Sequence, residues 1–343
     1  MLDDLKMIHE RDAQDALGVA EKMYQQLDQE FALPESFRPG EIKNVVLAGM
    51  GGSALAASLA KIWPGLGVPF EVVRDYALPS YVGPDTLLIA SSYSGNTEEA
   101  LSALAEAEQK NAIIVTVASA GKLAEAANSK GYPLLTIPAG YKQRYTIWFQ
   151  LKALVTIFEA TGLVSGKMAE LVAARDWLQQ TASAWIPTVP TAQNLAKQIA
   201  QECVGKSVVI YGGPLMFPAA YKWKISFNEN AKQVAWCNQY PEFNHNEFLG
   251  WTKQPVQKPY TVVELRSNLE HERVQKRFEV SERLLSGMRP APIVVKPGGE
   301  TLLQQLMWAI ALGDFVSLYT ALLNGINPSP VDLIEKFKIA LDE

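Results

Sequence analysis

The sequence predicts an α/β fold in which mainly parallel sheets are covered by helices on both faces. Three observations support this prediction. Short apolar runs that suit buried strands alternate with amphipathic helical stretches. The alternation starts at residue 43 and resumes after Pro187 and Pro190. Residues 208–213 also repeat the pattern of residues 45–52, an apolar run that ends in paired glycines. The repetition indicates two related α/β units.

The first half of the chain opens with a long amphipathic helix and then alternates. Apolar side chains recur near helical spacing over residues 3–31, and Pro34 and Pro39 then break the pattern. The expected strands are residues 44–48, 70–73, 86–90, 112–117 and 133–137, and the expected helices between them are residues 54–62, 98–109 and 123–128.

The second half begins with helical residues 145–180, which Gly162 and Gly166 interrupt. We expect residues 1–155 to form the N-terminal helix and a first domain, 156–190 a helical linker region, and 191–343 a second domain. In that domain the pattern predicts helices at 192–203 and 217–235, strands at 207–211, 260–265 and 293–295, and a helical part from 302 to 343.

Composition narrows the class of protein. With 343 residues, of which 48% are apolar and 20% charged, the chain is typical of a two-domain globular protein. A net charge of −5 argues against a nucleic-acid-binding surface. Cys203 and Cys237 are too few for a disulfide framework and are expected to be buried thiols. The N-terminus lacks a signal-peptide core, and no uncharged run suggests a membrane span, so we expect a cytoplasmic protein.

Two loops rich in glycine and hydroxyl groups suit a small phosphate. Gly51, Gly52 and Ser53 follow the first expected strand. Ser92, Ser94 and Thr97 lie at the end of the third, around Gly95. Small residues there let backbone N–H groups face an anion at a helix N-terminus, and the hydroxyls add donors.

The first loop alone is also compatible with a tight turn or with a dinucleotide fingerprint. That fingerprint needs an acidic residue about 20 positions on, and Asp75 lies slightly beyond this spacing. The hydroxyls of the second loop could instead cap the helix that starts near Glu98. Three hydroxyls exceed what one cap needs, so the phosphate interpretation is favoured.

Acid–base candidates lie in the second half. Glu229 occurs in an otherwise amphipathic helix, where the alternative is a solvated helix position, and His245 lies in a polar loop, where the alternative is a capping residue. Arg144 follows a strand end and could bind a phosphate or hydroxyl, or lie on the surface. No spacing of histidines or cysteines suits a metal, so none is expected.

Six segments carry a family resemblance. They are GMGGS at 49–53, SYSGNTEE at 92–99, the turn ending at Arg144, NENAK at 228–232, PEFNHNE at 241–247 and NPSPVDLIEKFK at 327–338. With these segments in this order the chain resembles the bifunctional phosphoglucose/phosphomannose isomerases, which are built from two sugar-isomerase (SIS) domains. The resemblance implies two SIS-type domains, each a flavodoxin-like three-layer α/β/α structure.

The resemblance also implies roles. Gly51, Gly52, Ser53, Ser92, Ser94 and Thr97 would hold the sugar phosphate. Glu229 would be the base that moves a proton between C2 and C1, with Arg144 stabilising the enediolate. His245 would assist ring opening, with Lys336 as a second contributor. Ser329 stands where the family often has a threonine and would contact substrate. The implied assembly is a homodimer in which His245 serves the partner's site.

The expected activity is therefore interconversion of glucose 6-phosphate or mannose 6-phosphate with fructose 6-phosphate, without cofactor or metal, through a cis-enediol. Three alternatives stay open at this point. One is a non-catalytic phosphosugar-binding regulator, a second is a nucleotide-dependent oxidoreductase, and a third is an isomerase of another phosphosugar.

Overall fold

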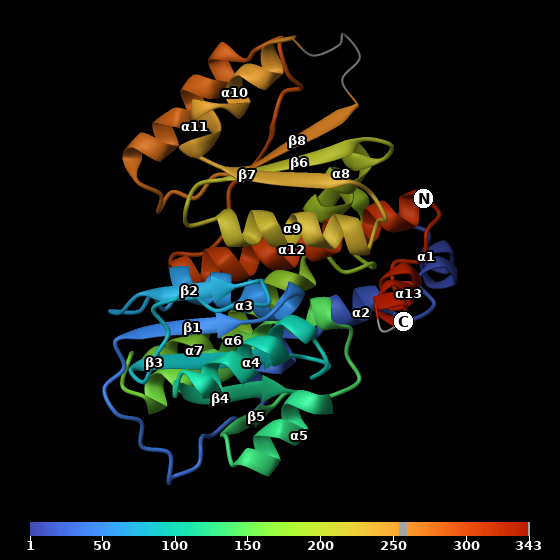
Figure 1. Cartoon of the computed structure of the whole chain (residues 1–343). Coiled ribbons are helices and arrows are strands. Elements are labelled where there is room, and N and C mark those ends of the chain that lie inside the picture. The colour runs from blue at the N-terminus through green and yellow to red at the C-terminus, as the bar shows by residue number, and fades with distance from the viewer. Residues whose placement is uncertain (254–258, 342–343) are drawn as a thin grey trace. The chain divides into compact units, whose positions relative to one another are not determined.

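The computed structural model describes residues 1–253 and 259–341. The chain divides into two compact units, Met23–Asp176 and a unit formed by Met1–Lys22 with Trp177–Glu343 (Figure 1). This division places the first 22 residues with the second half of the chain, whereas the sequence-based boundaries place them in a first domain of residues 1–155. The contacts between α2 (Ala16–Glu21) and α12 (Leu302–Leu323) explain the assignment.

The unit Met23–Asp176 is built on a five-stranded parallel sheet in the order β2-β1-β3-β4-β5. β1 and β3 form because their apolar runs are buried on both sides, as expected of a parallel sheet. On α4, Ala100, Ala103 and Ala107 are buried and allow close helix–sheet packing. The elements are η1 (Met23–Asp28), β1 (Asn44–Ala48), α3 (Gly51–Ile62), β2 (Phe70–Val73), β3 (Thr86–Ser92), α4 (Glu98–Gln109), β4 (Ile113–Ala118), α5 (Gly121–Lys130), β5 (Leu134–Thr136), η2 (Gln143–Tyr145), α6 (Ile147–Ala160) and the start of α7 (Lys167–Ser183).

The other unit holds a four-stranded parallel sheet in the order β7-β6-β8-β9. α8 and α9 cover one face of this sheet and α10 and α11 the other (Figure 1). The elements are α1 (Leu5–Arg11), α2, η3 (Thr191–Gln193), α8 (Leu195–Cys203), β6 (Ser207–Gly212), α9 (Phe217–Glu229), β7 (Ala235–Gln239), η4 (Glu242–His245), α10 (Glu247–Gly250), η5 (Trp251–Lys253), β8 (Tyr260–Leu265), α11 (Glu272–Leu284), β9 (Ile293–Val295), α12 and α13 (Asp332–Leu341). Two sheets of parallel strands flanked by helices confirm the predicted fold class.

α12 is the one described helix that is long and apolar enough to cross a membrane. However, 89% of its most apolar window is buried inside the protein. It packs against α8 and α9. A helix that is apolar all round and buried in this way is the core helix of its unit.

The N-terminal helix is shorter than predicted, because aspartates divide it. The Asp12 carboxylate accepts hydrogen bonds from the backbone N–H groups of Ala16 and Leu17, both at 2.8 Å. Asp15 adopts a left-handed conformation with φ 52°. Aspartate side chains that bind nearby backbone donors favour caps over helix interiors, so the expected single helix becomes α1, α2 and η1.

β7 was not predicted, and the expected helix at 217–235 was too long. α9 ends at Glu229, and Lys232 then takes φ 53° before the chain enters β7. β7 is an edge strand with Trp236 exposed, so its sequence lacks the apolar run that marks a buried strand. The C-terminal helical part is also two helices, α12 and α13, and residues 342–343 of that prediction lie outside the described residues.

Candidate active site

The two predicted phosphate loops meet at the carboxyl edge of the first sheet. β1 and β3 are neighbours, while the chain continues from β1 to β2 on one side and from β3 to β4 on the other. In open α/β sheets, ligands bind in the crevice at such a switch point. Here the loop after β1 leads into α3 and the loop after β3 leads into α4, so two helix N-termini border the crevice.

Close backbone approach explains two of the glycines. A Cβ on Gly49 would lie 2.6 Å from the carbonyl oxygen of Ser91. A Cβ on Gly52 would lie 2.9 Å from the carbonyl oxygen of Gln143, the residue before Arg144. Three segments that are distant in sequence, around residues 50, 91 and 143, therefore pack against one another within this unit.

The hydroxyls of the second loop form a local network. Ser92 Oγ lies 2.7 Å from Thr97 Oγ1 and accepts from the N–H of Gly95 at 3.0 Å. Ser94 is exposed, and its Oγ accepts from the N–H of Asn96 at 3.3 Å. Thr97 is the N-cap residue of α4, yet its side chain makes no capping bond among the described residues. The structure therefore uses Ser92 to shape the loop and presents the hydroxyl of Ser94 to solvent.

Ser53 of the first loop and Arg144, which follows β5, are both buried in this unit. Ser53 Oγ is buried and has no hydrogen-bond partner within the described part of the chain. A buried hydroxyl in that state costs about 1–3 kcal/mol, so it is a strong candidate to bind a ligand oxygen. Arg144 is 5% exposed, and its guanidinium carbon lies 4.9 Å from the ring centre of Tyr145. The stacking orients a planar donor that suits phosphate or enediolate oxygens.

Replacing Ser94 and Thr97 together by Ala is expected to raise KM for a phosphosugar by roughly 10²–10⁴-fold, with kcat largely kept. Each hydrogen bond to a charged group contributes about 1.5–3 kcal/mol, and the phosphate does not react. Steady-state kinetics measures this. Ser102→Ala is the matched control, because that α4 hydroxyl binds the carbonyl of Tyr76 instead. An unchanged KM in the double variant would count against the phosphate loops.

The second sheet repeats the switch point, but its crevice holds a side chain of the protein. The order β7-β6-β8-β9 places the loops after β6 and β8 side by side. Glu270 Oε1, from the loop after β8, accepts hydrogen bonds from the N–H groups of Leu215 at 2.9 Å and Met216 at 3.2 Å. A Cβ on Gly213 would lie 2.4 Å from this carboxylate. A carboxyl group of the chain itself therefore occupies the place that corresponds to the phosphate loops, a feature that the sequence analysis did not identify.

Glu270→Gln is expected to flatten the pH dependence of the free energy of unfolding. Burial raises the pKa of Glu270 from 4.5 to about 7, against the effect of its two backbone hydrogen bonds. Between these values the folded state keeps a proton that the unfolded state has lost, so the free energy of unfolding falls as pH rises. The fall is about 3 kcal/mol at most. Urea denaturation from about pH 5 to pH 8 measures this fall in the free energy of unfolding. If the free energy of unfolding of the variant fell with pH as steeply as that of the wild type, Glu270 would not be the group responsible.

Buried polar side chains attach the helix that carries Glu229 to α12. Lys222, Ser226 and Asn230 recur on one face of α9 and are all buried. Lys222 pairs with Asp314 of α12, and Ser226 Oγ donates to the same carboxylate at 2.8 Å. Asn230 Nδ2 donates to Ser317 Oγ at 2.9 Å. α9 is therefore tied to α12 by polar side chains as well as by apolar packing.

The structure brings Glu229 and Ser329 into one region. Glu229 is half-buried at the last position of α9. Lys232 Nζ donates to the carbonyl oxygens of Glu229 at 2.5 Å and of Pro328 at 3.1 Å, which joins the helix end to the turn that contains Ser329. Lys336 lies beyond this turn, exposed on α13.

His245 does not lie in the same region as Glu229 and Ser329 of its own chain. It is exposed at the end of η4, after β7. Phe243 of η4 is buried in a cluster with Phe278 of α11, so η4 lies on the face of the sheet that α10 and α11 cover. α9 covers the opposite face (Figure 1). α9 and η4, the elements that carry Glu229 and His245, therefore lie on opposite faces of the second sheet, and the two residues lie before and after β7 in the chain.

In the part of the chain that the structure describes, neither the two cysteines nor a cluster of metal-ligating side chains forms a further site. Cys203 is buried and Cys237 half-buried, and burial raises their pKa values to about 12 and about 11. Within residues 1–253 and 259–341, no group of three or more histidine, cysteine, aspartate or glutamate side chains could hold a metal ion.

Comparison with known proteins adds to this geometry. Residues 192–341 match the family described as the bacterial phospho-glucose isomerase C-terminal SIS domain. The chain is 35% identical over 308 residues to the bifunctional phosphoglucose/phosphomannose isomerase of Caldicellulosiruptor bescii, covering 88% of this chain and 91% of that protein. It is 33% identical over 215 residues to a D-glucosamine-6-phosphate 4-epimerase of Sulfolobus acidocaldarius, covering 62% of this chain and 65% of that protein. A crystal structure of a glucose-6-phosphate isomerase like protein from Thermus thermophilus is similar with a TM-score of 0.67 and 21% identity, covering 97% of this chain and 99% of that chain.

The parallel sheets and their switch-point loops define a protein of the SIS class, with two α/β domains. The chain belongs to the bifunctional phosphoglucose/phosphomannose isomerase family. The resemblance expected from the six sequence segments is thereby confirmed, and the chain is classed with isomerase enzymes.

Proposed function

We propose that this protein interconverts fructose 6-phosphate with glucose 6-phosphate, mannose 6-phosphate or both, by proton transfer between C1 and C2. The observation that carries the proposal is Glu229, a half-buried carboxylate on a helix end that Lys232 fixes next to Ser329. A cis-enediol route needs one base to remove a proton from one carbon and return it to the other. A carboxylate that is only partly solvated suits this role.

In this proposal the remote phosphate supplies binding energy that orients the reacting carbons. Ser53, Ser92, Ser94 and Thr97 would bind the phosphate together with backbone N–H groups of Gly51 and Gly52. Arg144 would stabilise charge on the enediolate oxygen. Ser329 would contact the sugar, and Lys336 would assist ring opening.

We further propose a homodimer in which His245 serves the partner's site. This part of the proposal is supported by the position of η4, the element that ends at His245, since it lies on the opposite face of the sheet from α9, which ends at Glu229. An exposed histidine with a polar surrounding loop suits proton transfer to a ring oxygen of a substrate bound elsewhere. We also propose that the protein is cytoplasmic and that its activity needs neither a cofactor nor a metal.

The deciding experiment is incubation of the purified protein with fructose 6-phosphate and separate detection of glucose 6-phosphate and mannose 6-phosphate. Formation of either product supports the proposal, and the ratio gives the substrate preference. The similarity to a glucosamine-6-phosphate epimerase makes amino-sugar phosphates the necessary second set of substrates. Turnover of those substrates alone would replace the proposed substrate. Tight binding without turnover of any of them would indicate a phosphosugar-binding regulator.

A further inference from the structure

The segment that carries His245 is anchored on both sides of the histidine. His245 itself is exposed, but its neighbours Asn244 and Glu247 are partly buried and direct their polar groups into the protein. Each of the two side chains uses both of its polar atoms in hydrogen bonds. The pattern is that of a short, rigid support for one outward-facing side chain.

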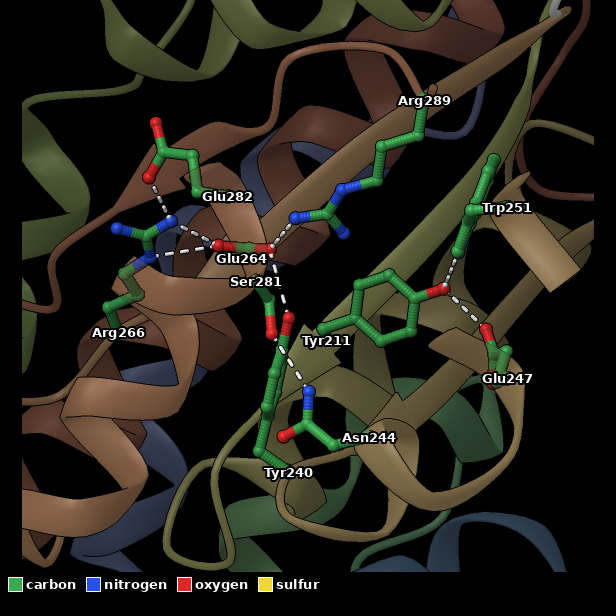
Figure 2. Close-up of polar contacts among 10 residues, drawn as sticks. All are labelled: Tyr211, Tyr240, Asn244, Glu247, Trp251, Glu264, Arg266, Ser281, Glu282 and Arg289. Atoms are coloured by element: carbon green, nitrogen blue, oxygen red, sulfur yellow. Dashed lines mark hydrogen bonds and ion pairs between the residues drawn. The ribbon is translucent and has the colours of Figure 1, made fainter. Parts of the chain in front are cut away.

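Asn244 ties the segment to α11. Its Nδ2 donates to Ser281 Oγ at 2.8 Å (Figure 2), and its Oδ1 accepts from Arg277 Nη1 at 3.1 Å. Because the amide uses its donor and its acceptor on two residues of one helix, its orientation is fixed. The backbone that leads directly into His245 is fixed with it.

Glu247 ties the other side to the sheet. The hydroxyl of Tyr211 donates to Glu247 Oε1, and Asn238 Nδ2 donates to Oε2 at 2.6 Å. The Tyr211 oxygen also accepts from Trp251 Nε1 at 3.0 Å (Figure 2). Burial and the nearby carboxylate raise the pKa of Tyr211, so it remains a protonated donor. Tyr211 and Asn238 are paired residues of β6 and β7, which makes this anchor part of the sheet.

Aromatic packing and buried charge stiffen the base of the segment. The ring of Phe243 lies 4.7 Å from that of Tyr211 and 4.8 Å from that of Tyr240, measured between centroids. The hydroxyl of Tyr240 donates to Glu264 at 3.4 Å. Glu264, which is fully buried, also accepts from Arg289 at 2.5 Å (Figure 2). Buried networks of this kind hold side chains in one arrangement.

We propose that Asn244 and Glu247 are positioning residues for His245, which they hold in the geometry that proton transfer requires. The proposal rests on the proposed function, in which His245 acts on the sugar ring. A displacement of about 1 Å at a catalytic group can cost roughly 10²-fold in rate, so two independent anchors next to one residue have a clear use.

The test compares Asn244→Leu and Glu247→Gln with His245→Ala in the full-length protein, using fructose 6-phosphate turnover. We expect kcat to fall by about 10–100-fold in each anchor variant, while KM and the inhibition constant of an open-chain aldonic acid phosphate change less than about twofold. The open-chain inhibitor needs no ring opening, so its binding reports the substrate contacts that do not involve His245. In the His245→Ala background, Asn244→Leu should cause no further loss of kcat, because the side chain that Asn244 positions is already absent.

Controls separate positioning from a general loss of structure. Gln275→Leu removes hydrogen bonds from α11 to Asn268 and Glu270 without touching the segment, and should keep wild-type kcat. If Asn244→Leu does not fold, Asn244→Asp keeps an acceptor for Arg277, replaces the donor to Ser281 by a second acceptor oxygen and adds a negative charge.

Two outcomes overturn the proposal. One is an unchanged kcat in both anchor variants while His245→Ala is impaired, and the other is a full additional loss from Asn244→Leu in the His245→Ala background. An unimpaired His245→Ala variant would instead remove the role of His245 from the proposed function, and the positioning role with it.

Discussion

Glu229→Gln is expected to lower kcat for fructose 6-phosphate by roughly 10²–10⁴-fold, the usual contribution of a positioned general base. Glutamine has nearly the same shape, but its amide cannot take the proton from C1 or C2. Binding should survive, because the proposed phosphate ligands belong to the unit Met23–Asp176 and Glu229 to the other. Single-turnover kinetics measures the rate, and equilibrium binding of an open-chain aldonic acid phosphate measures affinity.

The matched control is Glu202→Gln, which alters an exposed carboxylate on α8 of the same unit. Its kcat should equal that of the wild type. A Glu229→Gln variant that stays within a few-fold of the wild-type rate would show that another residue is the base.

Co-expression of Glu229→Gln with His245→Ala then tests the homodimer. If His245 acts on the partner's site, a mixed dimer has one site with both residues intact, and random pairing restores about a quarter of wild-type activity. Absence of activity in a verified mixed dimer would place both residues in the site of one chain, against the placement of α9 and η4 on opposite faces of the second sheet.

Asp314→Leu is expected to destabilise the protein by about 3–5 kcal/mol, because it leaves the ammonium of Lys222 buried without its anionic partner. Both side chains are at most 1% exposed, and Ser226 donates to the same carboxylate. The double variant Lys222→Met with Asp314→Leu should recover most of the loss, since replacing a whole buried pair by apolar groups is often neutral. Urea denaturation monitored by tryptophan fluorescence gives the free energies of unfolding.

The comparison pair is Lys276 and Glu279, whose charged groups are 2.9 Å apart but 62% and 61% exposed. Glu279→Ala should cost less than about 1 kcal/mol. Equal effects at the two pairs would contradict the claim that desolvation makes the Lys222–Asp314 pair critical for α9 and α12.

The strand pattern was predictable wherever strands are buried on both faces. β1 and β8 lie inside their sheets and match the predicted residues, because continuous apolar runs bounded by polar turns are the direct signature of central parallel strands. β2 and β9 are edge strands with an exposed residue each, and they match because they keep short, mainly apolar runs. β7 escaped prediction because its last two residues, Asn238 and Gln239, are polar, so no continuous apolar run marks the strand. The N-terminal helix was predicted as one because its apolar spacing continues through Asp12 and Asp15, which the structure uses as caps and turns.

The candidate site was predictable as a set of local motifs. Glycines and hydroxyls after two strands pointed to a phosphate, and Glu229 and His245 were recognisable by residue type and by their neighbours. Glu270 and the anchors of His245 were not recognisable, because Leu215, Ser281 and Tyr211 are distant from them in sequence. The loop after β8 corresponds to the second phosphate loop, so the repeat itself was a signal that could have drawn attention to Glu270.

The sequence by itself determined the two-sheet α/β class and the family, because these depend on local patterns and on motif order. Only the tertiary structure decided which residues meet. Strand order placed the loops after β1 and β3 in one crevice and filled the matching crevice of the second sheet with Glu270. Helix placement put α9, which ends at Glu229, and η4, which ends at His245, on opposite faces of one sheet. Such pairings depend on long-range packing of buried surfaces, which no local pattern in the chain records.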